Sequence, residues 1–327
     1  MSAVDRVPKA DIHCHLEGTA SAGLVRELAA KNGVALDPAL FGPDGDYVWR
    51  DFPTFLKAYD AAARAICTPE DYARVMFEHL RGTAAEGLIY AEVFASPEHA
   101  HTSGMSYADM LEGLAAGITR AETELGVTAR IIIVALRHLP AERATWAARL
   151  AADHPHPIVT GFGLAGDETQ RHMRDFAPAF AIAHAAGLGC TAHAGEVCGP
   201  ESVRDALDLL PVTRLGHGVR AIDDPELVAR IRDQRIVLEV CPGSNLALDL
   251  YPSPDAHPLR RLHDAGCRVT LNADDPPFFA TSTGAEYDLA HNSMGFSADE
   301  LTQLTRNAVE AAFVDAETRE ALLARLA

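Results

Sequence analysis

The chain has 327 residues, of which 48% are hydrophobic and 23% charged, so it can bury a large core and is not a disordered or low-complexity protein. Its formal net charge of −18 repels phosphate backbones and anionic lipid, which excludes nucleic acid and membrane surfaces as favourable partners. The chain has no apolar run long enough to span a membrane and no apolar signal core near its start, so we expect a soluble, cytoplasmic protein.

Short β-rich runs alternate with helical stretches along the whole chain. This alternation predicts a parallel sheet with helices outside it, and eight such runs predict an α/β fold closed into a (β/α)8 TIM barrel. Barrels of this kind often form one unit, so we expect a single domain over residues 1–327. The expected strands are Ala10–His15, Ile89–Ala95, Arg130–Leu136, Ile158–Ala165, Gly189–His193, Thr213–His217, Ile236–Val240 and Arg268–Asn272.

The intervals between these strands carry helix signals, several of them opened by Pro or by Ser and Asp caps. Three of the expected helices are Ser103–Leu125, Glu201–Leu210 and Pro225–Asp233. The interval between the first two strands, at about residues 19–87, is too long for an ordinary loop. We interpret this interval as a helical insertion.

Two helices are expected inside the insertion. Thr68 has the character of an N-cap, followed by Pro and two acids, so a helix should follow it to about Arg81. Upstream, four apolar side chains recur at i, i+3, i+4 and i+7 and therefore share one helix face. They are Phe52, Phe55, Leu56 and Tyr59. Such a face is typical of core packing.

Polar groups end four of the expected strands. His13 and His15 alternate in the first strand, so both imidazoles point to the same side and could bind one metal ion, although paired structural histidines give the same pattern. The fifth, sixth and eighth strands end in His193-Ala-Gly-Glu196, Gly216-His217-Gly218 and Asn272-Ala-Asp274-Asp275-Pro276. Barrel enzymes place their sites at this end of the strands, so the four groups together indicate an active site.

Three imidazoles and one carboxylate form a suitable ligand set for Zn²⁺, with a water or hydroxide completing the coordination. Such an ion lowers the pKa of a bound water to about 7, which is the chemistry of hydrolysis. Glu196 follows a candidate ligand by three residues and is not needed as one, so we expect it to act as a general acid. Taken singly, His193 or His217 would be structural histidines, and the paired acids before Pro276 would form a turn or cap.

The other histidines and the cysteines lack this setting. We interpret His138 and the His99 and His101 pair as structural, although they follow the third and second strands and could line the mouth of the barrel. The remaining histidines are interpreted as surface or structural residues: His79, His154, His156, His172, His184, His257, His263 and His291. Six scattered cysteines are expected to be free thiols without a functional role.

The motifs together resemble those of the adenosine/adenine deaminase family of the amidohydrolase superfamily. The resemblance is collinear from about Pro8 to Tyr287, and its motifs occur in the family's order. They are His-x-His-Leu-(Asp/Glu)-Gly, Leu-Ala-Gly-Asp-Glu, His-Ala-Gly-Glu, Gly-His-Gly and Asp-Asp-Pro. The resemblance implies a (β/α)8 barrel, one catalytic zinc, a small-molecule purine substrate, and exchange of a purine 6-amino group for oxygen.

The resemblance also implies roles for single residues. The family's zinc ligands match His13, His15, His193 and Asp274. Glu196 matches the acid that protonates purine N1, and His217 the imidazole that orients or deprotonates the attacking water. Asp274 is also expected to relay a proton of that water.

Substrate contacts follow from the same resemblance. Asp275 matches the carboxylate at purine N7 and Gly166 the backbone donor to N3, with His15 and Glu17 also facing the substrate. The apolar face of Phe52, Phe55, Leu56 and Tyr59 matches a family helix that covers the purine, so we favour a lid for this helix over core packing.

Two departures bear on the substrate. Glu17 stands where nucleoside-specific members usually carry an Asp, which favours free adenine. The motifs Leu164–Glu168 and Gly216–Gly218 resemble the nucleoside branch instead, while Gly163 replaces an acid that is common before Leu-Ala-Gly. We therefore expect deamination of adenosine and 2′-deoxyadenosine to the inosine products and ammonia, with adenine or another 6-aminopurine derivative as the alternative.

Two other classes of protein remain open at this point. One is a catalytically inactive metal-binding barrel, which would have no need of Glu196 and His217 beside the metal. The other is a barrel hydrolase for phosphoesters or lactones, which often uses two metals and a bridging Lys, yet no Lys ends an expected strand here. The physiological metal and the oligomeric state are not predicted.

Overall fold

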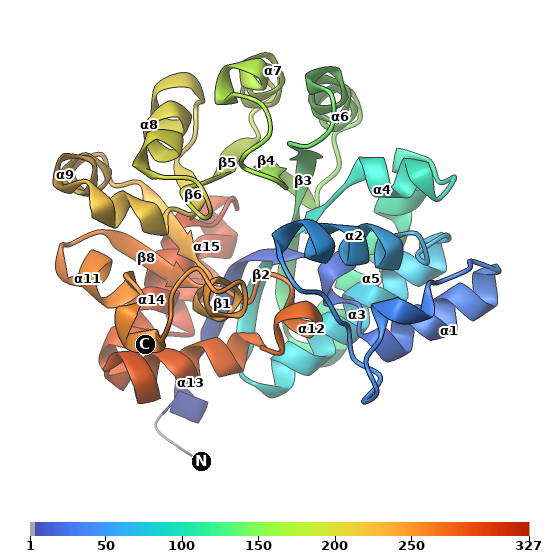
Figure 1. Ribbon diagram of the computed structural model, residues 1–327, viewed down its shortest axis with the longest axis horizontal. Helices are drawn as coiled ribbons and strands as arrows, with labels where there is room; N and C mark the ends of the chain where they lie inside the picture. Colours follow the sequence, from blue (N-terminus) through green and yellow to red (C-terminus); the bar gives the residue numbers. More distant parts are fainter. Residues whose placement is uncertain (1–3, 327) are drawn as a thin grey trace.

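Eight parallel strands form the centre of the molecule. In the computed structural model, which describes residues 4–326, the strands pair in chain order from β1 to β8 (Figure 1). Residues 1–3 and 327, the two ends of the expected single domain, lie outside the described residues. The strands are β1 (Lys9–His15), β2 (Leu88–Ala95), β3 (Thr128–Leu136), β4 (Val159–Ala165), β5 (Gly189–Ala194), β6 (Arg214–His217), β7 (Val237–Val240) and β8 (Arg268–Leu271).

Backbone hydrogen bonds between β1 and the residues after β8 close the sheet into a barrel. The backbone N–H of His15 donates to the carbonyl of Asp274 at 3.0 Å, and the N–H of Asp274 donates to the carbonyl of His13 at 3.1 Å. The expected (β/α)8 barrel is therefore confirmed. The closure also brings the first and last polar motifs of the chain side by side.

Helices surround the barrel, and Figure 1 shows α6, α7, α8 and α9 in an arc along its upper and left margins. The helices are α1 (Ala22–Asn32), α2 (Phe52–Ala63), α3 (Pro69–Ala85), α4 (Pro97–Thr102), α5 (Tyr107–Leu125), α6 (Ala141–Asp153), α7 (Ala177–Ala185), α8 (Pro200–Leu209), α9 (Pro225–Asp233), α10 (Pro242–Ala247), α11 (Leu259–Asp264), α12 (Pro276–Phe279), α13 (Thr283–Met294), α14 (Ala298–Ala311) and α15 (Ala316–Ala324). Helix α5 begins four residues later than expected, because the Ser106 side chain accepts from the N–H of Asp109 and caps the helix there.

Helices α1, α2 and α3 occupy the interval between β1 and β2. Asp51 and Thr68 each form a capping box at the start of α2 and α3, which explains where these two helices begin. Helix α3 continues to Ala85, four residues beyond the expected Arg81, and the chain turns at Gly87 with a φ of 95°. Figure 1 shows α1, α2 and α3 gathered on one side of the barrel next to α5.

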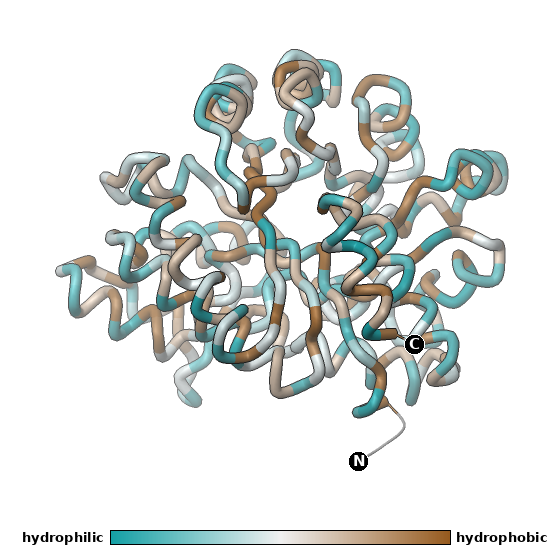
Figure 2. Tube along the Cα trace, turned by 180° about the vertical axis from the view of Figure 1, so that it is seen from behind, coloured by the Kyte–Doolittle hydropathy of each residue, from teal (hydrophilic) through white to brown (hydrophobic). Residues whose placement is uncertain are grey.

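The strands are buried on both faces, as a parallel barrel requires. Every residue of β1 and β2 is buried, whereas hydrophilic stretches lie mainly on the outlying turns of helices and loops (Figure 2). All six cysteines are free thiols. Within residues 4–326, none of the helices has the length and apolar character to cross a membrane.

Charged side chains from β2, β6 and β7 form a buried ion-pair network. The Arg214 guanidinium lies 2.6 Å from a carboxylate oxygen of Glu92 and 2.6 Å from one of Glu239. The guanidinium carbon lies over the Phe313 ring, 3.7 Å from the ring centroid. All three charged side chains are buried, and this pairing is what allows Glu239 to stand behind the active site.

Candidate active site

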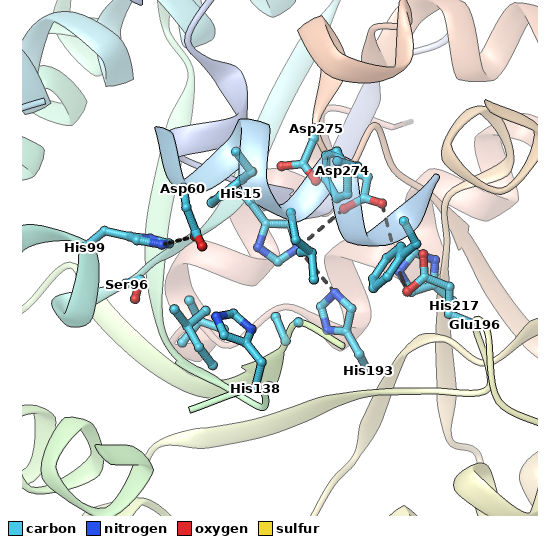
Figure 3. A pocket seen from close by; sticks show the side chains of 18 of the residues that line it. His15, Asp60, Ser96, His99, His138, His193, Glu196, His217, Asp274 and Asp275 are labelled. Carbon is cyan, nitrogen blue, oxygen red and sulfur yellow. Dashed lines mark hydrogen bonds and ion pairs between the residues drawn. The ribbon is translucent and has the colours of Figure 1, made fainter. Parts of the chain in front are cut away.

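A pocket with about 560 Å³ of empty space opens where the polar motifs meet at the carboxyl ends of the strands. Figure 3 shows Glu196, His217, Asp274 and Asp275 toward one end of it, and Asp60, Ser96, His99 and His138 toward the other. The expected site residues that line the pocket are His15, Phe52, Phe55, Leu56, Tyr59, Gly166, His193, Glu196, His217, Asp274 and Asp275. His13 and Glu17 lie behind this lining and are almost completely buried.

The four expected metal ligands converge on one point. His193 Nε2 lies 3.0 Å from His13 Nε2 and 3.3 Å from His15 Nε2. Asp274 Oδ1 lies 3.4 Å from His15 Nε2 and 3.8 Å from His13 Nε2. His217 is also close, because ligand atoms of His13, His193, His217 and Asp274 all lie within 4.8 Å of one another.

The hydrogen bonds of two imidazoles leave their inner nitrogens free to bind a cation. His13 Nδ1 lies 2.7 Å from the Glu239 carboxylate and His193 Nδ1 lies 2.9 Å from the Leu164 carbonyl, so both Nδ1 atoms donate and both Nε2 atoms carry lone pairs. Burial lowers the pKa of His193 to about 4 and that of His13 well below its ordinary value. Neutral imidazoles around a buried carboxylate fit Zn²⁺.

Two residues at the centre of the site adopt a backbone conformation that side chains rarely tolerate. His217 has a φ of 57° and Asp274 a φ of 61°, both in the left-handed region. Each such residue costs about 1–3 kcal/mol, and such costs are typical of functional sites. The surrounding barrel therefore maintains a strained geometry at these two strand ends.

The carboxyl groups beside the expected metal ligands have raised pKa values. Burial raises the pKa of Glu196 well above its ordinary value, and the nearby Asp274 and Glu168 raise it further. Burial followed by Asp274 likewise raises the pKa of Asp275, whose Oδ1 has no hydrogen-bond partner among the described residues. The Glu196 carboxyl lies 3.6 Å from His217 Nε2. Burial therefore favours the protonated form of both carboxyl groups, which is the form that can donate a hydrogen bond.

Glu168 holds the loop that carries Glu196. Its carboxylate accepts from the four backbone N–H groups of residues 195–198 at 2.7 to 3.0 Å, and from the Ser202 hydroxyl at 2.7 Å. The side chain is only 2% exposed, so these bonds are shielded from water. Glu168 stands in the Leu164–Glu168 motif, but the spacing of that motif does not predict this role.

Glu17 is enclosed at the other end of the pocket. One of its oxygens accepts from the Tyr59 hydroxyl at 3.0 Å, and the other accepts from the Ser96 N–H at 3.3 Å. His99 Nδ1 lies 3.6 Å from that second oxygen, and His99 Nε2 lies 3.1 Å from Asp60. Burial alone would lower the pKa of His99, but the hydrogen bonds and charges of Asp60 and Glu17 raise it to about 9.

The structural interpretation of His99 and His138 is corrected, because both side chains line the pocket. His101 does not line it and packs instead against Trp146, with ring centroids 5.6 Å apart. The barrel rule that located the other site residues also applies to His99 and His138, which follow strands β2 and β3. Asp60 was missed, although it lies four residues after Leu56 on the same helix face.

At two glycines in and near the pocket, a side chain would collide with neighbouring rings. A Cβ at Gly163 would lie 2.7 Å from the Phe94 ring, which stacks on His15 with centroids 4.8 Å apart. The Phe94 ring therefore occupies the space that the family's acid at this position would need. Gly166 lines the pocket with a φ of 95°, and a Cβ there would lie 2.8 Å from His138 Nδ1.

Comparison with known proteins agrees with this geometry. The adenosine deaminase family model matches residues 8–327. The chain is 51% identical to an adenine deaminase of Sinorhizobium medicae and 50% identical to one of Agrobacterium fabrum, each over 318 residues. These matches cover 97% of this chain and 98% and 97% of the two relatives.

Solved structures show the same barrel. An adenine deaminase from Arthrobacter aurescens superposes with a TM-score of 0.90 at 29% identity, covering 98% of both chains. A zinc-bound amidohydrolase from Burkholderia ambifaria also gives a TM-score of 0.90 at 29% identity, covering 99% of this chain and 90% of that one. An Arabidopsis N6-mAMP deaminase gives 0.87 at 26% identity, covering 100% and 99%. The chain belongs to the adenosine deaminase family.

Proposed function

We propose that this protein is a zinc-dependent deaminase that hydrolyses adenine to hypoxanthine and ammonia. Relatives about 50% identical over nearly the whole chain are named adenine deaminase, which supports the free base over the nucleoside. Adenosine, which the Leu164–Glu168 and Gly216–Gly218 motifs favoured, is therefore the weaker expectation. The base was the alternative that Glu17 favoured.

The environment of Glu17 is the observation that carries the choice of a base. A carboxylate that binds a ribose hydroxyl must be reachable from the pocket. Glu17 is 1% exposed, and both of its oxygens already accept hydrogen bonds, from Tyr59 and from the Ser96 N–H. A ribose entering this end would have to displace Tyr59, leaving Glu17 without its hydroxyl donor at a cost of about 1–3 kcal/mol.

The polar groups at the same end suit the edge of a free purine. His138 lines the pocket, and its Nδ1 has no hydrogen-bond partner among the described residues. Adenine presents N3 and a nitrogen-bound hydrogen on its five-membered ring, whereas adenosine carries a sugar there. A free base would thus supply a partner to an imidazole nitrogen that otherwise has none.

The metal-binding residues of the proposed site are His13, His15, His193 and Asp274. A bound divalent ion lowers the pKa of a water to about 7 and so supplies the nucleophile. The protein's own contribution is to orient the ligands of that ion, since Glu239 and the Leu164 carbonyl fix the rings of His13 and His193.

The purine is bound and activated by the protonated carboxyl groups. Glu196 holds a proton that it donates to purine N1, which makes C6 more electrophilic. Asp275 donates to N7 through Oδ1, which has no hydrogen-bond partner among the described residues, and Gly166, which lines the pocket, would donate its backbone N–H to N3. The apolar face of α2, with Phe52, Phe55, Leu56 and Tyr59, covers the ring and excludes bulk water.

A side-by-side assay tests the proposal. Zinc-loaded protein is incubated separately with adenine, adenosine and N6-methyl-AMP, and release of ammonia or methylamine is followed together with the purine product. We expect kcat/KM for adenine to exceed that for adenosine by at least about 10²-fold, because the ribose of adenosine would meet the enclosed Glu17 carboxylate. A preference for adenosine would contradict the proposed substrate, and turnover of none of the three would contradict the function.

A further inference from the structure

We infer that Asn245 and His257 are positioning residues that fix the tautomer of His217, keeping its proton on Nε2, the nitrogen that faces the reaction centre. The inference rests on the proposed function only for the consequence it has for turnover. The tautomer itself follows from a chain of three hydrogen bonds that begins at a backbone amide. Asn245 lies in α10, after β7, and His257 lies two residues before the start of α11.

The chain begins at Leu259. Its backbone N–H donates to His257 Nδ1 at 3.2 Å. A backbone amide can only donate, so His257 Nδ1 must carry a lone pair, and the proton of this ring is on Nε2. His257 is 2% exposed and its ring packs edge-on against Tyr251, with centroids 4.9 Å apart, so the ring orientation is fixed by packing as well.

The second and third hydrogen bonds fix the donor and acceptor atoms as far as His217. His257 Nε2 lies 3.1 Å from Asn245 Oδ1, and the oxygen is the only atom of the Asn245 amide that can accept its proton. The Asn245 Nδ2 group then lies 3.3 Å from His217 Nδ1 and donates to it. His217 Nδ1 therefore carries a lone pair, and its ring proton is on Nε2.

This tautomer distinguishes His217 from the neighbouring imidazoles, which carry their proton on the other ring nitrogen. His13 and His193 donate through Nδ1, to Glu239 and to the Leu164 carbonyl, and so offer bare Nε2 atoms. His217 has the opposite arrangement, and its Nε2–H points toward Glu196 Oε2 at 3.6 Å and Asp274 Oδ2 at 3.9 Å. His217 can thus hold and stabilise the attacking oxygen as a hydrogen-bond donor, but it is not a fourth imidazole ligand.

The direct test is nitrogen-15 NMR of the imidazoles in zinc-loaded wild-type protein. The His217 signals are assigned by their loss in a His217→Gln variant. We expect the spectrum to show a protonated Nε2 and an unprotonated Nδ1 for His217, and the reverse for His13 and His193. A proton on Nδ1 of His217 would overturn the inference, whatever the enzyme's substrate.

Variants connect the tautomer to turnover. Asn245→Asp replaces the donor by an acceptor and draws the His217 proton to Nδ1. We expect kcat to fall about 10- to 100-fold, with KM within about threefold and one metal per chain retained. A kcat within about threefold of wild type, in a variant whose spectrum shows the proton moved, would overturn the consequence for catalysis.

A conservative change at His257 provides the rescue. His257→Gln can accept from the Leu259 N–H through its oxygen and donate to Asn245 through its nitrogen, so it preserves the direction of the chain. We expect the wild-type tautomer and a kcat within about threefold of wild type, whereas His257→Phe should lose both. Equal loss in the Gln and Phe variants would contradict the inference, since packing would then explain the effect.

His79→Gln is the matched control, because it removes another buried imidazole that lies in α3 and does not line the pocket. We expect a lower melting temperature with unchanged kcat. Failure of the proposed function is recognised separately: wild-type protein without purine deaminase activity but with Nε2 of His217 protonated would contradict the function and leave the tautomer assignment standing. If Asn245→Asp does not fold, the wild-type spectrum still decides.

Discussion

The two ends of the pocket are built in different ways. The metal end, which contains the expected metal ligands, is built from residues at or shortly after β1, β5, β6 and β8. Short contiguous motifs place its side chains on a rigid barrel. The opposite end comes from α2, α4 and the loop after β3, where Asp60, His99 and His138 meet across long stretches of sequence. In the proposed function, the residues that carry the chemistry therefore come from contiguous motifs, whereas those that select the substrate come together through tertiary contacts.

The largest expected effect lies at the metal end. Glu196→Gln keeps the shape of the acid but removes the proton that purine N1 receives, so we expect kcat to fall about 10²–10⁴-fold. Metal content should remain one per chain, because Glu196 is not among the proposed ligands. Ammonia release and metal analysis on the same sample measure both quantities. A wild-type rate would contradict the acid role.

At the opposite end of the pocket, His99 should account for most of the stability that the protein loses at alkaline pH. His99 has a pKa raised to about 9 in the folded protein against about 6.5 when unfolded, so its contribution is complete below pH 6.5 and is lost as the pH rises through 9. We expect about 3 kcal/mol of unfolding free energy to be lost over this range in wild type and to be missing from His99→Gln. Urea denaturation of both proteins across the range measures this difference. Parallel curves would show that His99 is not the group responsible.

Glu168→Gln tests whether the loop that carries Glu196 must be held rigidly. The amide offers one acceptor oxygen to donors that now share two, so we expect kcat to fall about 10- to 100-fold and the melting temperature to drop. Asp167→Asn is the control, because within residues 4–326 the Asp167 carboxylate accepts only from Thr169 and Gln170 in its own loop. Equal rates in the two variants would contradict the role of the Glu168 contacts.

The smallest effect is expected at the enclosed carboxylate. Glu17→Asp shortens the side chain, weakens its contact with the Tyr59 hydroxyl and leaves room at this end of the pocket. We expect the ratio of kcat/KM for adenosine to that for adenine to rise about tenfold, about 1.4 kcal/mol of discrimination. Tyr59→Phe, which removes only the hydroxyl, should shift the ratio less. An unchanged ratio in both variants would place substrate selection elsewhere.

Much of the barrel could be predicted from the sequence because its signals are local. Each strand is a short β-rich run bounded by helix signals, and the structure shifts the expected boundaries by only one or two residues, as at β3 and β8. Larger differences occur at α3 and α5, where a capping hydroxyl or a turning glycine decides the boundary. The polar ends of strands β1, β5, β6 and β8 could be placed together because closure of a parallel barrel leaves them no alternative.

The remaining parts of the site depend on contacts that sequence spacing does not reveal. Glu239 lies one residue before the end of β7 and reaches His13 through the barrel interior, with Arg214 beside it. His257 acts through Asn245, twelve residues away, and neither follows a recognisable motif. His99 and His138 do follow strand ends, but a histidine at such a position is more often structural, so only the assembled pocket identifies them.

A zinc titration tests the central claim most directly. Metal is removed from the protein, zinc is added in fractions of an equivalent, and adenine turnover is measured at each step. The account predicts no turnover without metal and a linear rise that ends at one equivalent per chain, because one group of three imidazoles and Asp274 holds the ion. Turnover by metal-free protein, or a maximum at two equivalents, would contradict it.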